Sequence, residues 1–152
     1  MSNPSATLVE LKQTLQSVIE ALIDSQKCFK KTGEEMEEPT LKLNFLNESL
    51  QRAEFRGDIE SILHQEGEHD IKERGTITAD LQRGWGSLRA ALGGGDQALV
   101  DTADLSEHTT IQVYANATHD DLPYPVRQIL DAQVAHIQLF HNYLKYLCAI
   151  NR

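Results

Sequence analysis

Acidic side chains and imidazoles on helical faces are the residues of this sequence best suited to metal chemistry. Glu107 stands four residues from both Ala103 and Ile111, so it shares a helical face with apolar side chains. Glu54 follows the apolar stripe of an earlier helix, and His141 ends a Gln-x-x-His sequence in the last one. Carboxylate oxygens and imidazole nitrogens are ligands for iron and manganese. We therefore treat Glu54, Glu107 and His141 as candidate metal ligands.

A pair of metal ions in a helical bundle needs more carboxylates than these positions supply. Such centres use a Glu from each of two helices and a Glu-x-x-His from each of the other two. Gly57 stands three residues after Glu54, and Gln138 occupies the carboxylate position before His141. A di-iron centre, a mononuclear iron or manganese site and a buried hydrogen-bond cluster all stay open. The small number of carboxylates favours the cluster, whose predicted members are Gln51, Glu54, Glu107, Gln138 and His141.

Helices must position these side chains, because apolar residues recur at steps of three and four along the chain and no segment alternates like a strand. The first helix is predicted to begin near Thr7 and to end between Gly33 and Pro39. Pro39 suits the first turn of a second helix, which fades near Gly67. The fold class is all-α. The apolar stripe predicted for the second helix is Leu43, Leu46, Leu50, Ala53 and Gly57.

The second half of the chain repeats this plan. A short helix is predicted over 80–92, a long one over 96–119, capped by Asp96, and a last one from about Pro125 almost to Arg152. Short connections around Pro39 and Pro123 favour antiparallel hairpins. The intervening segment, 70–95, is long enough to cross a bundle. We therefore predict a single domain over 1–152: a ferritin-like four-helix bundle with two antiparallel hairpins joined by a long crossover.

Several short sequences resemble a bacterial ferritin-like four-helix-bundle family of unknown function. The most specific is Gly-Trp-x-x-Leu-x-x-Ala-Leu-x-Gly-Gly-Asp within 83–96. The resemblance implies the fold and a superfamily whose oxidases and iron-storage proteins carry a carboxylate-bridged di-iron site, but no activity for this family. The other residues that carry it are Cys28–Lys31, Glu38–Lys42, Tyr114, Asp121–Pro123, Gln133 and His141.

The charge composition limits the classes of partner that the protein can bind. The chain has 14 basic and 23 acidic side chains, a net charge of −9 and a pI near 5.0, so it repels nucleic acid and anionic lipid. No secretory signal or membrane span is expected. Cys28 and Cys148 match no metal or redox motif, which favours a reduced, cytoplasmic protein. Self-association is the expected interaction.

The function predicted from these features is that of a non-enzymatic or uncharacterised bundle protein with a degenerate metal site and a structural or stress-related role. No cofactor is expected, although iron or manganese stays possible. The alternative is a metal-dependent oxidase or peroxide-handling protein that uses a carboxylate and histidine site in the bundle core. A partner-binding bundle is a third possibility, which would require an exposed apolar patch.

Overall fold

A computed structural model describes residues 4–67, 95–119 and 121–150 of the chain. Within these ranges it contains the helices α1 (Pro4–Glu35), α2 (Pro39–Gln65), α4 (Asp96–His119) and α5 (Tyr124–Ile150), and no strand. The all-α prediction is therefore confirmed. The predicted helix at 80–92 and Trp85 lie outside the described residues. No described helix is long and apolar enough to cross a membrane.

The boundaries of α2 follow from local chemistry. Glu38 is the N-cap, and its carboxylate accepts hydrogen bonds from the backbone N–H groups of Thr40 and Leu41 at 3.1 and 2.8 Å. Pro39 has no backbone N–H, which costs nothing at the first helical position because an N–H there would have no partner within the helix. Gly67 has φ +88°, a conformation that ends a helix at little cost only for glycine.

Asp96 has a different role from the predicted one. Instead of capping its own helix, its carboxylate accepts hydrogen bonds from the backbone N–H groups of Glu37 and Glu38 at 2.8 and 2.9 Å. It therefore ties the α1–α2 connection to the beginning of α4.

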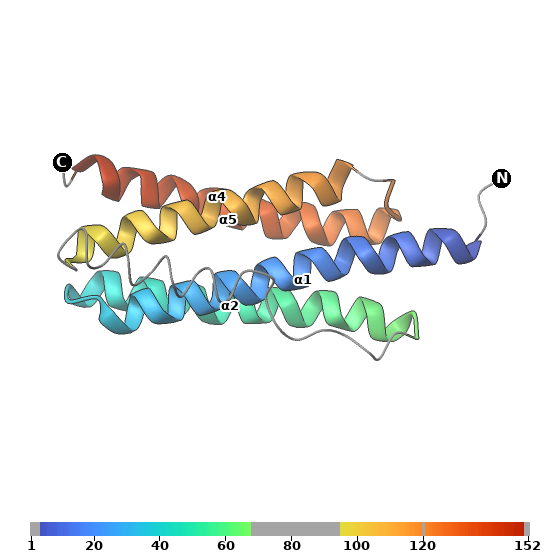
Figure 1. The fold of residues 1–152 in the computed structure, drawn as a ribbon, viewed down its shortest axis with the longest axis horizontal. Helices are drawn as coiled ribbons and strands as arrows, with labels where there is room; N and C mark the ends of the chain where they lie inside the picture. Colours follow the sequence, from blue (N-terminus) through green and yellow to red (C-terminus); the bar gives the residue numbers. More distant parts are fainter. Residues whose placement is uncertain (1–3, 68–94, 120, 151–152) are drawn as a thin grey trace.

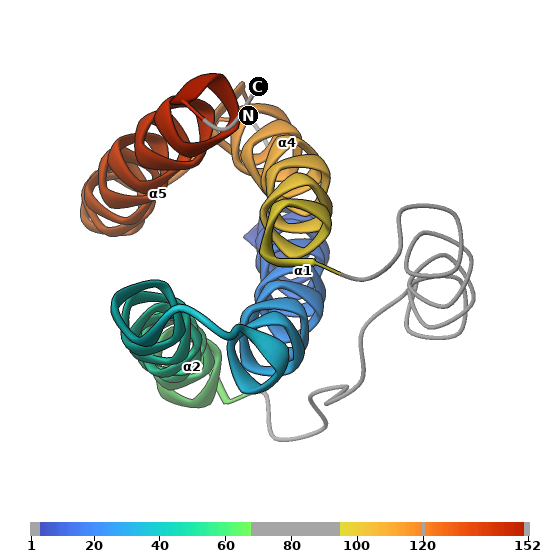
Figure 2. The same ribbon diagram turned by 90° about the vertical axis from the view of Figure 1, so that its left-hand side faces the viewer.

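The helices pack in the order α2, α1, α4 and α5 around the bundle, as Figure 2 shows end on. In Figure 1, α1 and α5 run from right to left, whereas α2 and α4 run from left to right. Long side chains bridge α2 and α5: Asn44 Nδ2 donates to Tyr143 Oη at 3.0 Å, and Gln133 Nε2 donates to the carbonyl oxygen of Phe55 at 3.2 Å. Phe45 of α2 also packs against Phe140 of α5 with ring centroids 6.0 Å apart, so polar and aromatic contacts together join this side of the bundle.

Two apolar clusters form the core. One contains Leu15, Ile19 and Tyr114 among its buried members, and the other contains Phe29, Phe45 and Leu144. On α1 and α5, apolar residues that recur at steps of three and four are buried, among them Leu15, Ile19 and Leu22 on α1 and Leu130, Ile137 and Leu144 on α5.

The stripe predicted for α2 was wrong. Leu43 and Leu50 are 59% and 69% exposed. The helix instead buries a face on which polar residues separate the apolar ones, so apolar periodicity points away from the true interior. The buried residues of α2 are Phe45, Glu48, Ser49, Arg52, Ile59 and Leu63.

Candidate functional site

Arg52 carries a guanidinium group into the centre of the bundle. Its side chain is fully buried, with 0% of its surface exposed. Both terminal nitrogens reach Glu107 of α4: Nη1 donates to Oε1 at 2.6 Å, and Nη2 donates to Oε2 at 2.8 Å. Glu107 is also fully buried. Paired, parallel N–H···O bonds of this kind are among the strongest in proteins.

The remaining helices supply further acceptors and a second imidazole. Arg52 Nε donates to Glu48 Oε1 at 2.9 Å, and Arg52 Nη1 donates to Ser25 Oγ of α1 at 2.9 Å. His136 Nε2 of α5 lies 2.8 and 3.1 Å from the two carboxylate oxygens of Glu48. Each described helix therefore contributes to this group. We call it the core polar cluster: Ser25, Glu48, Arg52, Glu107 and His136.

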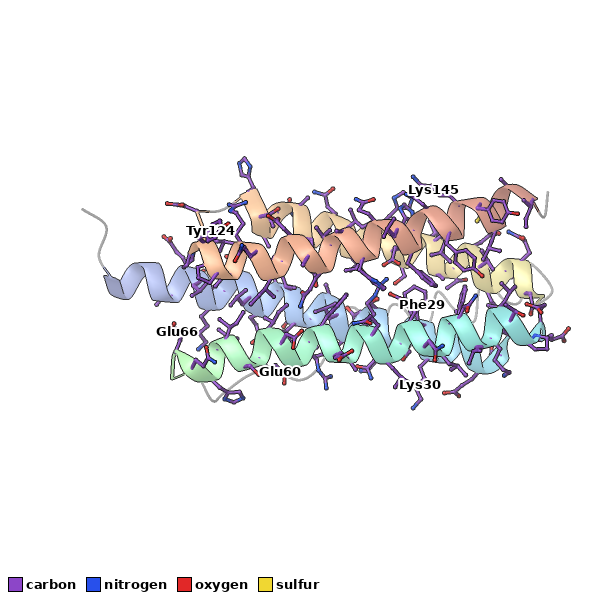
Figure 3. The ribbon with its side chains drawn as sticks, turned by 180° about the vertical axis from the view of Figure 1, so that it is seen from behind. Phe29, Lys30, Glu60, Glu66, Tyr124 and Lys145 are labelled. Carbon is purple, nitrogen blue, oxygen red and sulfur yellow. The ribbon has the colours of Figure 1, made fainter. Side chains whose placement is uncertain are left out.

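An aromatic side chain covers the guanidinium. Arg52 Cζ lies 4.9 Å from the ring centroid of Phe29, a favourable cation–π arrangement. Figure 3 shows Phe29 between the helices, and its ring packs edge-on against Phe45 and Phe140 with centroids 5.6 and 5.2 Å apart. The core polar cluster is thus excluded from water on this side.

Electrostatics keep the guanidinium of Arg52 charged, whereas burial raises the pKa of Glu107 despite the hydrogen bonds from Arg52. Burial alone would lower the pKa of Arg52, but hydrogen bonds and negative charge from Glu107 and Glu48 raise it above its ordinary value. The guanidinium is therefore a permanent cation. Both oxygens of Glu107 accept from it, so the negative charge of this carboxylate is balanced inside the protein.

A second carboxylate and histidine group lies between α4 and α5. Asp104 and His108 are one turn apart on α4, and His141 comes from α5. Asp104 Oδ1 lies 3.0 Å from His141 Nε2, and Asp104 Oδ2 lies 3.9 Å from His108 Nε2. The two imidazole rings meet edge-on with centroids 4.5 Å apart. We call this group the α4–α5 cluster.

The candidate ligands named from the sequence occupy three different environments. Glu107 faces inward, as expected, and pairs with Arg52. Glu54 is exposed and accepts from Gln51 Nε2 at 3.4 Å. His141 is buried and belongs to the α4–α5 cluster. The structure therefore does not bring Glu54, Glu107 and His141 together.

The predicted hydrogen-bond cluster was wrong in its membership, because Glu54 and Gln138 are both exposed. A buried hydrogen bond does join α4 and α5 elsewhere: Tyr114 Oη donates to Gln133 Oε1 at 2.6 Å. Burial raises the pKa of Tyr114, so the phenol stays a hydrogen-bond donor.

A family model described as a domain of unknown function, DUF2383, matches residues 10–120. The chain belongs to the DUF2383 family. The match covers Ser25, Glu48, Arg52 and Glu107 of the core polar cluster, whereas His136 lies beyond it. No curated protein matches the sequence. The evidence for the function of this DUF2383 chain therefore rests on its own residues.

Sequence reasoning missed Arg52 because a charged residue within a polar stretch is usually solvated. Two features of the sequence could have pointed to Arg52. Glu48 and Arg52 stand at i and i+4, and the leucines of this helix do not form a strongly apolar face for burial. A further signal was Gln133-x-x-His136, five residues before the Gln138-x-x-His141 sequence that was chosen. In this DUF2383 chain, the earlier sequence contributes its histidine to the core polar cluster.

Proposed function

We propose that this DUF2383 chain is a non-enzymatic ferritin-like bundle in which the guanidinium of Arg52 occupies the place that metal ions take in related centres. The helix directions visible in Figure 1 support a ferritin-like arrangement, because α1 runs parallel to α5 and α2 runs parallel to α4. A long connection between α2 and α4 is typical of that fold.

Arg52 carries the proposal. A carboxylate-bridged metal pair requires inward carboxylates whose charge is neutralised by the metal ions. Here Glu107 is neutralised by two hydrogen bonds from Arg52, and Glu48 accepts a third from the same guanidinium. A metal ion bound to Glu107 would have to displace a cation that has no route to water without breaking these bonds. The residues present therefore do not fit a di-metal centre.

Neutral groups in the surrounding positions point the same way. Ser25, on α1, offers a hydroxyl that already accepts from Arg52. Gln133-x-x-His136 has the Glu-x-x-His spacing with an amide in place of the carboxylate, and that amide oxygen accepts from Tyr114. These groups satisfy one another without a metal ion. The role that follows is structural: the polar centre locks the helices in register.

A metal-dependent oxidase is the competing function. It is favoured by the convergence of Glu48, Glu107 and His136, which are all metal-ligand types, on one centre. Activity would require that Arg52 leave this centre. Oxygen uptake after anaerobic loading with Fe²⁺ separates the two functions.

In that experiment, we expect the wild-type protein to consume oxygen no faster than Fe²⁺ in buffer. The matched control is Glu107→Gln, which removes the carboxylate charge from the centre but keeps its shape. Rapid oxygen uptake that is lost in Glu107→Gln would support the oxidase and reject the structural role.

Self-association is a further part of the proposed function. Leu43 and Leu50 stand seven residues apart on the outer face of α2 and are strongly exposed. This spacing suits packing against a helix of a second copy. Light scattering coupled to size-exclusion chromatography tests it: we expect an oligomer that Leu43→Glu/Leu50→Glu converts to a monomer. A monomeric wild-type protein would contradict this part of the proposal.

A further inference from the structure

The α4–α5 cluster places a buried imidazole nitrogen against a buried carboxylate oxygen. Nε2 of His141 and Oδ1 of Asp104 are inaccessible to solvent and lie 3.0 Å apart. The two atoms meet without the geometry of a well-directed hydrogen bond, and neither has another hydrogen-bond partner among the described residues. His141 is 3% exposed and is thus held in place by packing. A poorly directed contact between buried polar atoms is costly and requires an explanation.

The third member of the α4–α5 cluster, His108, is exposed to solvent. His108 is on α4 one turn from Asp104, and its side chain is 60% exposed. Ligand atoms of Asp104, His108 and His141 all lie within 4.8 Å of one another. Around one tetrahedral Zn²⁺ ion, ligand atoms about 2.0–2.2 Å from the metal lie about 3.3–3.6 Å from one another. Asp104 Oδ1 and His141 Nε2 are already this close, so His108 has to move toward them. Rotation of the exposed His108 side chain can provide much of this movement.

We infer that Asp104, His108 and His141 bind one divalent transition-metal ion of the Zn²⁺ type at the α4–α5 surface. Two imidazoles and one carboxylate form a ligand set that Zn²⁺ accepts, with at least one coordination position left for water. The ligand groups already face one another, because Asp104 Oδ1 lies 3.0 Å from His141 Nε2 and the two imidazole rings meet with centroids 4.5 Å apart.

The surroundings define what else such a metal ion would meet. Asp104 also lines a shallow hollow of about 380 Å³, together with Asp101, Lys145 and Cys148. Cys148 Sγ lies 3.4 Å from Asp101 Oδ1 and donates to it, so the thiol is already engaged. Lys145 brings a positive charge near the site, which opposes cation binding; Figure 3 shows it on the outer side of the bundle. Removal of this charge should tighten metal binding.

This site does not depend on the structural role proposed for the core. Its residues share none with the core polar cluster, and its ligands face solvent through His108. Failure of either proposal therefore leaves the other intact.

Calorimetric titration of metal-free protein with Zn²⁺ tests the inference. We expect one Zn²⁺ per chain for the wild-type protein, and His108→Ala should weaken the affinity by roughly tenfold or more, because a ligand is lost. His108 is exposed, so this variant should fold normally. The matched control is His119→Ala, an exposed histidine on the same helix, which should bind Zn²⁺ as the wild type does.

Two further variants sharpen the result. Asp104→Asn should weaken binding like His108→Ala, whereas Lys145→Gln should strengthen it several-fold through loss of a nearby positive charge. Substitution of Co²⁺ adds a direct readout, since visible absorption of a site with nitrogen ligands should disappear in His108→Ala. Unchanged affinity in His108→Ala, equal losses in His119→Ala, or no binding by the wild type would overturn the inference.

Discussion

The core polar cluster and the α4–α5 cluster use the same side-chain chemistry and differ in one component. Each brings carboxylate oxygens and imidazole nitrogen together between helices. In the core, Arg52 donates to Glu107 and Glu48, so the negative charge has a cation from the same chain. In the α4–α5 cluster, Asp104 Oδ1 and His141 Nε2 face each other at 3.0 Å without the geometry of a well-directed hydrogen bond, and no other described residue donates to or accepts from them.

The presence of a cation from the same chain therefore decides whether a group of carboxylates and histidines is structural or can bind a metal ion. Burial makes an unpaired charge expensive, so a buried carboxylate must find a donor, a metal ion or a proton. Glu107 has found a donor, which makes it a structural residue. Asp104 is partly exposed, with 23% of its side chain accessible, and its only nearby imidazoles can share a metal ion with it.

Removal of the internal cation should have the largest effect. Arg52→Met leaves Glu107 buried without a donor, and we expect it to lower the free energy of unfolding by about 3–5 kcal/mol. Urea unfolding followed by circular dichroism measures this loss. The control is Arg56→Met, one turn later, where a 32% exposed arginine lies 3.1 Å from Glu60. That change should cost less than about 1 kcal/mol. Equal losses in both variants would contradict the special role of Arg52.

A double substitution sharpens the same point. In Arg52→Met/Glu107→Leu, the buried carboxylate disappears together with its donor, and apolar side chains replace both. We expect the double variant to be more stable than Arg52→Met by about 2 kcal/mol, because an uncompensated charge costs more than a missing pair. Urea unfolding of the wild type, of Arg52→Met, of Glu107→Leu and of the double variant gives the coupling energy. Strictly additive losses would show that charge pairing is not what stabilises this centre.

Zn²⁺ should stabilise the folded protein by binding at the α4–α5 cluster and not at the core polar cluster. At a free Zn²⁺ concentration about ten times the dissociation constant, binding to the folded state should add about 1.4 kcal/mol to the wild-type protein. His108→Ala should lack this gain but should match the wild type within about 0.5 kcal/mol in the presence of EDTA. Thermal unfolding with and without Zn²⁺ provides the measurement. An equal gain in His108→Ala would place the metal elsewhere.

The reactivity of the two thiols should differ between the two regions, and this is the smallest of the expected effects. Burial raises the pKa of Cys28 to about 12, and nearby Glu107 adds to the rise. At pH 8, Cys28 therefore has almost no reactive thiolate, and reactivity should rise only as the pH approaches 12. Cys148 is half-buried beside Asp101. Thiol titration at pH 8 should detect Cys148 first and Cys28 only in urea, with Cys28→Ala removing the slow phase. Rapid reaction of both thiols in the native protein would contradict the buried environment of Cys28.

Most of the helical framework could be predicted from the sequence, because periodic apolar residues and helix-ending Pro and Gly are local signals. The helices α1 and α5 bury strongly apolar stripes at the three- and four-residue spacing from which the sequence predicts helices. The second helix could not be oriented in the same way. It buries Arg52 and Glu48 and exposes Leu43 and Leu50, so its apolar pattern points the wrong way.

The candidate site was only partly predictable for the same reason. Glu107 was found because its neighbours at four-residue spacing are apolar, and in the structure it accepts from Arg52. The identity of that donor depends on how α2 is rotated against α4, a tertiary feature that no local pattern records. The partnership of Asp104 with His141 likewise depends on the packing of α4 against α5.

The proposal that Arg52 occupies the place of metal ions can be tested by metal analysis of the His108→Ala variant, purified from cells supplied with iron and manganese. This variant lacks the α4–α5 site but keeps the core polar cluster intact. The claim that Arg52 occupies the place of the metal ions predicts well under about one equivalent of iron or manganese per chain, since Glu107 offers no free charge to a metal. Two tightly bound metal ions per chain, lost on Glu107→Gln, would contradict it.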